Sequence, residues 1–167
     1  MPNTVERVVS GAMGAAKDVK AGFKGLTGVF MNLMEEHGKV SALIKRVATS
    51  NDAAVYARLY PTIRSELLAH ENGELKVVYP ALAEYPATAQ LAAMHAREAG
   101  ELQAVIAALD TLEYGDVGWM PAFRRLAHLV DRHVEEEESE YFPRGQHVIG
   151  EERARQLAAE YEATKHG

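Results

Sequence analysis

Two short segments of this 167-residue chain repeat the same spacing of histidine and glutamate. Each begins with a histidine, followed by a glutamate four residues later and then by an aromatic residue and a proline; the segments are residues 70–80 and 133–143. A single histidine precedes each segment, His37 the first and His95 the second. Because self-similarity along a chain indicates a repeated structural unit, we interpret the pattern as a duplicated helical hairpin.

The spacing places each pair on one side of a helix. Residues four apart in an α-helix lie one above the other, so His70 points with Glu74, and His133 points with Glu137. Apolar residues at three- and four-residue steps share these faces and the face of His95, which predicts that all of them point inward. The apolar residues are Ile63, Leu67, Val77 and Ala81; Leu91, Leu102, Ile106 and Leu109; and Leu126, Leu129 and Val130.

Four histidines and two glutamates that meet inside a protein need partners. Burying a carboxylate without a partner costs several kcal/mol of folding free energy. A bound cation removes that cost. Each glutamate has two oxygens with which to bridge two ions, and two imidazoles can complete each ion's protein ligands. Imidazole and carboxylate suit iron, zinc or manganese, while the absence of cysteine excludes thiolate zinc sites and iron–sulfur clusters. A lone histidine on an apolar face is more often a core residue, but the registered set favours metal.

Long helices must position these groups. The chain has few glycines and prolines, no β-strand alternation, and long stretches rich in Ala, Leu, Glu and Arg. We predict an all-α, up-down-up-down four-helix bundle with additional N- and C-terminal helices. The predicted bundle helices cover 28–49, 51–84 with a bend at Pro61, 88–112, and a segment that has Pro121 in its first turn and stops at Phe142-Pro143.

The terminal segments are predicted to be accessory. Residues 1–25 form an amphipathic, Gly-rich helix that covers the bundle or touches a membrane surface or partner, and a short helix over 150–164 packs along the outside. The predicted domain division is therefore 1–25, 26–145 for the bundle, and 146–167. A net charge of −6 argues against nucleic acid as a partner. We also expect no transmembrane segment and a cytoplasmic location.

The ordered set of residues over 33–143 resembles the hemerythrin-like (HHE cation-binding) proteins. The resemblance implies a non-haem di-iron centre in a four-helix bundle, with Glu74 and Glu137 as bridges and His37, His70, His95 and His133 as terminal ligands. Oxygen-carrying hemerythrins have a second histidine one turn after the third-helix ligand, where this chain has Ala99. Glu71 is the best candidate to fill the open position, as some intracellular members are similar in having His-Glu-x2-Glu. Weaker candidates for that position are Glu98 and Glu136, and Glu140 could support His133 from outside.

These features lead us to expect two iron ions with a solvent-derived bridge, and zinc or manganese as less favoured metals. The open position favours reaction with a small oxidant, namely hydrogen peroxide, oxygen or nitric oxide, and above all peroxide reduction or disproportionation in the manner of a peroxidase or catalase. Two alternatives stay open: an oxygen or nitric oxide carrier, and an iron or redox sensor without turnover. The sequence does not identify an electron donor or a partner protein.

Overall fold

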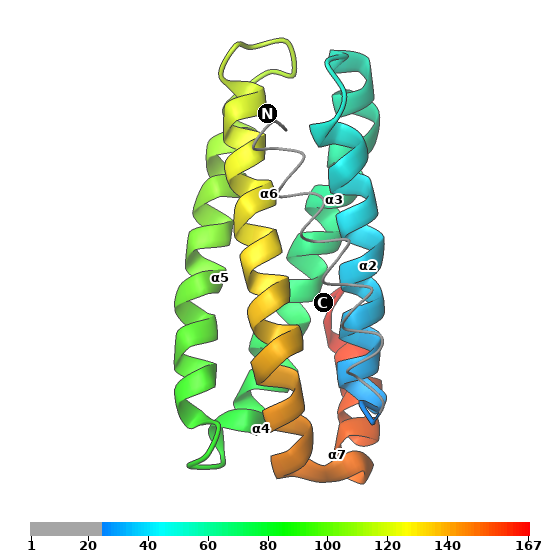
Figure 1. Ribbon diagram of the computed structural model, residues 1–167, viewed down its shortest axis with the longest axis vertical. Helices are drawn as coiled ribbons and strands as arrows, with labels where there is room; N and C mark the ends of the chain where they lie inside the picture. The colour runs from blue at the N-terminus through cyan, green and yellow to red at the C-terminus, as the bar shows by residue number, and fades with distance from the viewer. Residues whose placement is uncertain (1–24) are drawn as a thin grey trace.

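The computed structural model describes residues 25–167, which form a bundle of long antiparallel helices running up, down, up and down (Figure 1). The described part of the chain contains no strand. The elements in order are α2 (Gly28–Ala48), α3 (Ala53–Gly73), η1 (Glu74–Val78), α4 (Tyr79–Ala83), α5 (Ala89–Asp110), α6 (Trp119–Glu136), η2 (Glu137–Tyr141) and α7 (Phe142–Thr164). The fold prediction is thus confirmed for the bundle, whereas the N-terminal helix predicted over 1–25 lies outside the described residues apart from Gly25.

Local sequence signals account for the start and course of the second bundle helix. The side chain of Asp52 accepts a hydrogen bond of 2.9 Å from the backbone N–H of Ala54, which caps the first turn of α3. Pro61 lies inside α3, and the helix continues past it. The helical path then runs through η1 and α4 to Ala83, close to the predicted end at Glu84.

A π-helical turn follows the glutamate of each repeated segment, and neither turn was predicted. These turns are η1, beginning at Glu74, and η2, beginning at Glu137. A π-turn holds one extra residue, so it rotates everything after it by about 100° relative to an unbroken α-helix. Tyr79 would otherwise lie about 140° around the helix from Glu74, and the π-turn reduces this to about 40°. In the second repeat, the π-turn η2 likewise brings Phe142 toward the side of Glu137. Both aromatic residues therefore face the bundle interior.

The predicted helix end at Phe142-Pro143 is wrong. The helical path passes directly from η2 into α7, with Pro143 in the first turn of α7, where its missing N–H is tolerated. The sharp change of direction comes instead at Gly150, whose φ of 80° lies in the left-handed region that favours glycine. Beyond this kink α7 turns back along the bundle beside α2 (Figure 1).

Two apolar clusters fill the bundle, with a polar layer between them. One cluster includes Val40, Ile63, Leu102, Trp119 and Phe123. The other includes Phe30, Leu33, Val78, Phe142 and Leu157. His37 lies on α2 one turn from each cluster, between Leu33 and Val40, and is itself buried. The apolar clusters therefore enclose the layer that contains the predicted site residues. No helix of the described residues is long and apolar enough to cross a membrane.

Candidate metal centre

The structure brings all six predicted ligands together, and Glu71 with them. Their side-chain atoms form two adjacent groups, each with four donor atoms within 4.8 Å of one another. The first group consists of His37, His70, Glu74 and Glu137, and the second of Glu71, Glu74, His95 and His133. Glu74 belongs to both. Such a pair of groups has the composition that two neighbouring cations require, and the assignment of each residue as a ligand stays a prediction.

In the first group the ring nitrogens of two helices meet two carboxylates. The Nε2 atoms of His37 and His70 lie 3.2 Å apart. His37 Nε2 lies 3.3 Å from Glu137 Oε1, and His70 Nε2 lies 3.1 Å from Glu74 Oε1. Both histidines therefore direct the same ring atom, Nε2, into the centre.

Glu71 completes the second group. Its Oε2 lies 3.3 Å from His95 Nε2, and its Oε1 lies 3.3 Å from His133 Nε2. In the other repeat the corresponding residue is Val134, which is buried without a donor atom. The second group also approaches the first, since His133 Nε2 lies 2.8 Å from Oε1 of Glu137, a member of the first group. Of the three carboxylates proposed for the open position, Glu71 is the one placed among the ligands.

Three of the four histidines contact a carboxylate outside the two groups through Nδ1, the ring nitrogen that faces away from the centre. The Nδ1 atoms lie 3.2 Å from Glu138 for His37, 2.8 Å from Glu36 for His70, and 3.2 Å from Glu98 for His133. A carboxylate at Nδ1 favours the tautomer whose Nε2 is free to bind a metal.

Sequence reasoning missed two of these outer carboxylates. Glu36 and Glu138 each adjoin a predicted ligand in the sequence, and that adjacency is the one signal that could have marked them. Glu140, which we expected to support His133, is exposed and pairs with Arg144 at 3.0 Å. The π-turn that begins at Glu137 accounts for the error, because it changes which residues after Glu137 face inward.

The two aromatic residues of the repeats each cover a histidine of the opposite repeat. The Tyr79 ring stacks on His95 with 3.7 Å between centroids, and the Phe142 ring stacks on His37 at 5.7 Å. The Tyr79 hydroxyl also donates a hydrogen bond of 2.5 Å to Glu137 Oε2. These contacts shield the centre from water and orient one of its carboxylates.

Burial and charge act in opposite directions on the titration of the centre. Burial disfavours the charged imidazole of His70, but the carboxylates of Glu74 and Glu36 outweigh it and raise the pKa of His70 well above its usual value. The pKa of His133 is raised in the same way, with Glu137 outweighing burial. Burial would raise the pKa of Glu137, but His133 and His37 hold it well below the usual value.

Several inward atoms of the centre make no hydrogen bond, although they are buried. They are Oε2 of Glu71, both carboxylate oxygens of Glu74, Nε2 of His95 and of His133, and Oε1 of Glu137. Each buried polar atom without a hydrogen bond costs about 1–3 kcal/mol. Because these atoms are nitrogen and oxygen donors that point at one another, cations would satisfy them together, and the residues fit the di-metal group implied by the resemblance.

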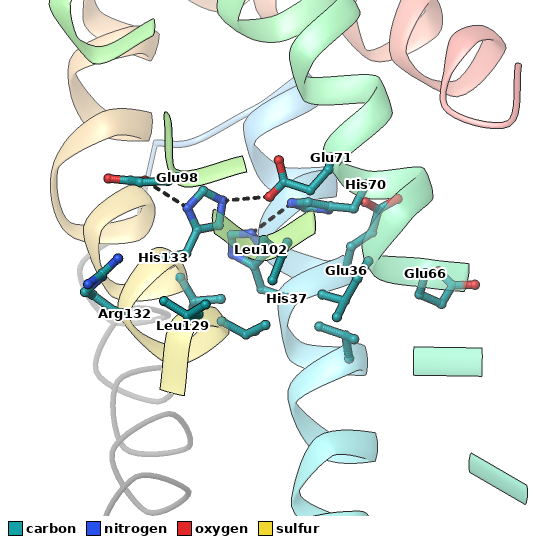
Figure 2. A pocket seen from close by; sticks show the side chains of 14 residues that line it. Glu36, His37, Glu66, His70, Glu71, Glu98, Leu102, Leu129, Arg132 and His133 are labelled. Atoms are coloured by element: carbon teal, nitrogen blue, oxygen red, sulfur yellow. Dashed lines mark hydrogen bonds and ion pairs between the residues drawn. The ribbon is translucent and has the colours of Figure 1, made fainter. Parts of the chain in front are cut away.

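A small cavity adjoins the two groups. Its volume is about 30 Å³, which is room for roughly one or two water molecules. His37, His70, Glu71 and His133 line it on the side of the centre, and apolar side chains such as Leu102 and Leu129 line it opposite (Figure 2). A ligand of a few atoms can therefore approach the centre, while a bulky organic molecule cannot without movement of these leucines.

Comparison with known proteins agrees with this geometry. Residues 30–144 match the model of the hemerythrin HHE cation-binding domain. The chain is 25% identical over 168 residues to a DNA nickase of Nostoc sp., an alignment that covers 93% of this chain and 48% of the nickase. It is 23% identical over 135 residues to an uncharacterized hemerythrin-like protein of Schizosaccharomyces pombe, covering 80% of this chain and 66% of that protein.

This chain thus spans about half the length of the first relative and 66% of the second. No solved structure shows a significant match. The family match covers more than half of the chain and includes every predicted ligand, both π-turns and the aromatic pair. The chain belongs to the hemerythrin HHE cation-binding domain family.

Proposed function

We propose that this chain is a non-haem di-iron protein that reacts with small oxidants, with hydrogen peroxide as the substrate that it reduces or disproportionates. The observation that carries the proposal is the pair of adjacent donor groups that share Glu74 and open on a cavity of about 30 Å³. His37 and His70 would hold one ion, His95, His133 and Glu71 the other, and Glu74 and Glu137 would lie between them. Two ferrous ions bound there would supply the two electrons, and two protons from solvent would complete the reduction of one peroxide to water; in disproportionation a second peroxide would return the electrons and leave as oxygen.

The chain's own residues account for the choice of substrate. The cavity, whose apolar lining includes Leu102 and Leu129, leaves room for a molecule of a few atoms. The three outer carboxylates keep a proton at Nδ1 of their histidines, so that Nε2 stays a ligand atom. Tyr79 keeps Glu137 oriented through its hydroxyl proton.

Ala99 supports turnover over reversible carriage. It occupies the position at which the oxygen-carrying relatives have their additional histidine, and it is buried without a donor atom. Glu71, from helix α3, contributes a carboxylate to the second donor group instead. Since an anionic ligand stabilises the ferric state better than a neutral imidazole does, we expect this centre to be oxidised by peroxide.

The test is anaerobic loading with ferrous iron followed by addition of hydrogen peroxide. We expect two irons per chain, consumption of peroxide, oxidation of the iron in the optical spectrum, and oxygen release if the reaction is disproportionation. Glu74→Ala should abolish loading of both ions, whereas Glu84→Gln, a charge change at an exposed position that does not line the cavity, should have no effect. A reversible oxygen or nitric oxide adduct without peroxide consumption would refute turnover and favour the carrier.

The DNA nickase activity of the Nostoc relative does not form part of this proposal. The alignment leaves about half of that protein unmatched, so its activity can reside outside the shared region. The net charge of −6 on this chain also opposes binding to the DNA backbone.

A further inference from the structure

The last two turns of α7 reach the metal centre from beyond the region that matches the family. Tyr161 is fully buried, and its hydroxyl donates a hydrogen bond of 2.6 Å to Glu36 Oε2. Lys165 donates a hydrogen bond of 2.6 Å from Nζ to the other oxygen of the same carboxylate. Glu36 in turn faces Nδ1 of His70 at 2.8 Å. The Tyr161 hydroxyl also lies 3.4 Å from His70 Nδ1, so a helix that we predicted to lie along the outside contacts His70 both through the Glu36 carboxylate and directly.

Asn72 and Gly73 of the first repeat form the docking site for the end of this helix. Asn72 donates hydrogen bonds from Nδ2 to the carbonyl oxygens of Thr164 at 3.1 Å and Lys165 at 3.2 Å, which satisfies carbonyls at the end of α7. Gly73 lies directly under the Tyr161 ring, and a Cβ at this position would stand 2.3 Å from a ring carbon. A side chain at Gly73 would therefore displace the tyrosine.

The second repeat has no corresponding docking site. The residues that correspond to Asn72 and Gly73 are Glu135, which is exposed, and Glu136. The two non-ligand residues between Glu71 and Glu74 are therefore explained by the docking of α7 rather than by metal binding.

The four histidines consequently differ in how firmly their rings are held. The carboxylate behind His70 has a hydrogen bond on each oxygen in addition to the imidazole. Glu98, behind His133, receives one further bond, 3.3 Å from the Tyr141 hydroxyl. Glu138, behind His37, has an oxygen without a hydrogen-bond partner, and Nδ1 of His95 has none either. His70 has the most constrained outer contacts.

We propose that Tyr161 and Lys165 are positioning residues of the metal centre, which fix Glu36 against His70 and so strengthen metal binding in the first group. The inference rests on the metal centre of the proposed function, but not on its reaction with peroxide. It assigns the C-terminal helix a role in the affinity of one of the two metal positions, beyond covering the bundle.

The test is titration of the full-length, metal-free chain with Co²⁺, whose d–d spectrum reports on its ligands. We compare wild type with Tyr161→Phe, which keeps the ring over Gly73, and with Lys165→Met; the controls are Tyr85→Phe and Lys76→Met, both at exposed positions. Loss of an outer partner of a ligating histidine typically costs 10–100-fold in metal affinity. Because the shortest contacts of both residues are with Glu36 and not with His70, we expect about a tenfold loss for one equivalent and no change for the other.

Four results separate positioning from mere packing. The proposal is supported if Lys165→Arg, which keeps the positive charge, binds Co²⁺ with wild-type affinity. It is also supported if the weakened equivalent is still observed in a Glu71→Gln background, where only the first group is expected to bind metal. Wild-type affinity for both equivalents in Tyr161→Phe and Lys165→Met would overturn it. Equal loss of both equivalents together with a lower melting temperature of the metal-free protein would also overturn it, since α7 would then be a structural cover. Because Co²⁺ binding needs no peroxide, failure of the peroxide reaction leaves this test unaffected.

Discussion

Replacing Glu71 with glutamine should remove the second metal position and leave the first in place. Both oxygens of Glu71 lie 3.3 Å from a histidine Nε2 of the second group, and neither belongs to the first group. Four-ligand structural zinc sites bind with roughly 10–16 kcal/mol, which is about 2.5–4 kcal/mol for each ligand. Loss of one ligand from a four-ligand group should therefore weaken binding on the order of 60- to 700-fold.

The assay is competition between the protein and a chelator of known affinity, with the retained metal counted per chain. We expect Glu71→Gln to retain one ion under conditions in which wild type retains two. Glu84→Gln is the matched control, because it makes the same charge change at an exposed position that does not line the cavity. Glu71→Val tests the comparison with Val134 of the second repeat and should behave as Glu71→Gln does. Two equally tight ions in Glu71→Gln would refute the assignment of Glu71 as a ligand.

Two further predictions concern the cavity and pH. Leu102→Ala should lower the free energy of unfolding by about 2–5 kcal/mol. Because Leu102 lines the cavity, the variant should also raise the ratio of the rate with tert-butyl hydroperoxide to the rate with hydrogen peroxide. Leu109 is also buried on α5 but does not line the cavity, so Leu109→Ala should leave that ratio unchanged. In the metal-free protein the pKa values of His70 and His133 are raised, so their contribution to stability is present below the ordinary value of 6.5 and is lost as pH rises through the higher folded values. Since ligating histidines must be neutral, metal affinity rises over the same interval. The increase in melting temperature on adding metal should thus grow as pH rises from 6.5 through the higher folded values, and an increase that shrinks with pH would contradict the linkage.

The long helices could be predicted from sequence because their signals are local. Apolar residues at three- and four-residue steps and the Asp52 cap fix where a helix begins and which face it buries. The predicted segments 28–49 and 88–112 accordingly differ from α2 and α5 by at most two residues at either end. The ligand set was accessible for the same reason, since residues four apart on a helix must share a face.

The features that the sequence did not reveal depend on contacts between distant segments. A π-turn at Glu74 has no local signature, because its extra residue is accepted only when Tyr79 gains its contact with His95 and Glu137. Tyr161 reads as an ordinary apolar position of an amphipathic helix until Glu36 is seen opposite it. The C-terminal helix therefore could be located from sequence, but its contact with the centre could not.

The asymmetry between the repeats has a chemical consequence for the two metal positions. Where the first repeat has Glu71 and Tyr79, the second has Val134 and Phe142. The Glu71 carboxylate of the first repeat extends across the bundle to His133. The Tyr79 hydroxyl of the first repeat donates a hydrogen bond to Glu137, the glutamate of the second repeat. Glu36, bound by α7, supports the first group. One donor group thus gains a carboxylate and the other a more rigid histidine, so under the proposed function the duplicated frame would hold two inequivalent ions, and the one beside Glu71 would be better suited to the higher oxidation state.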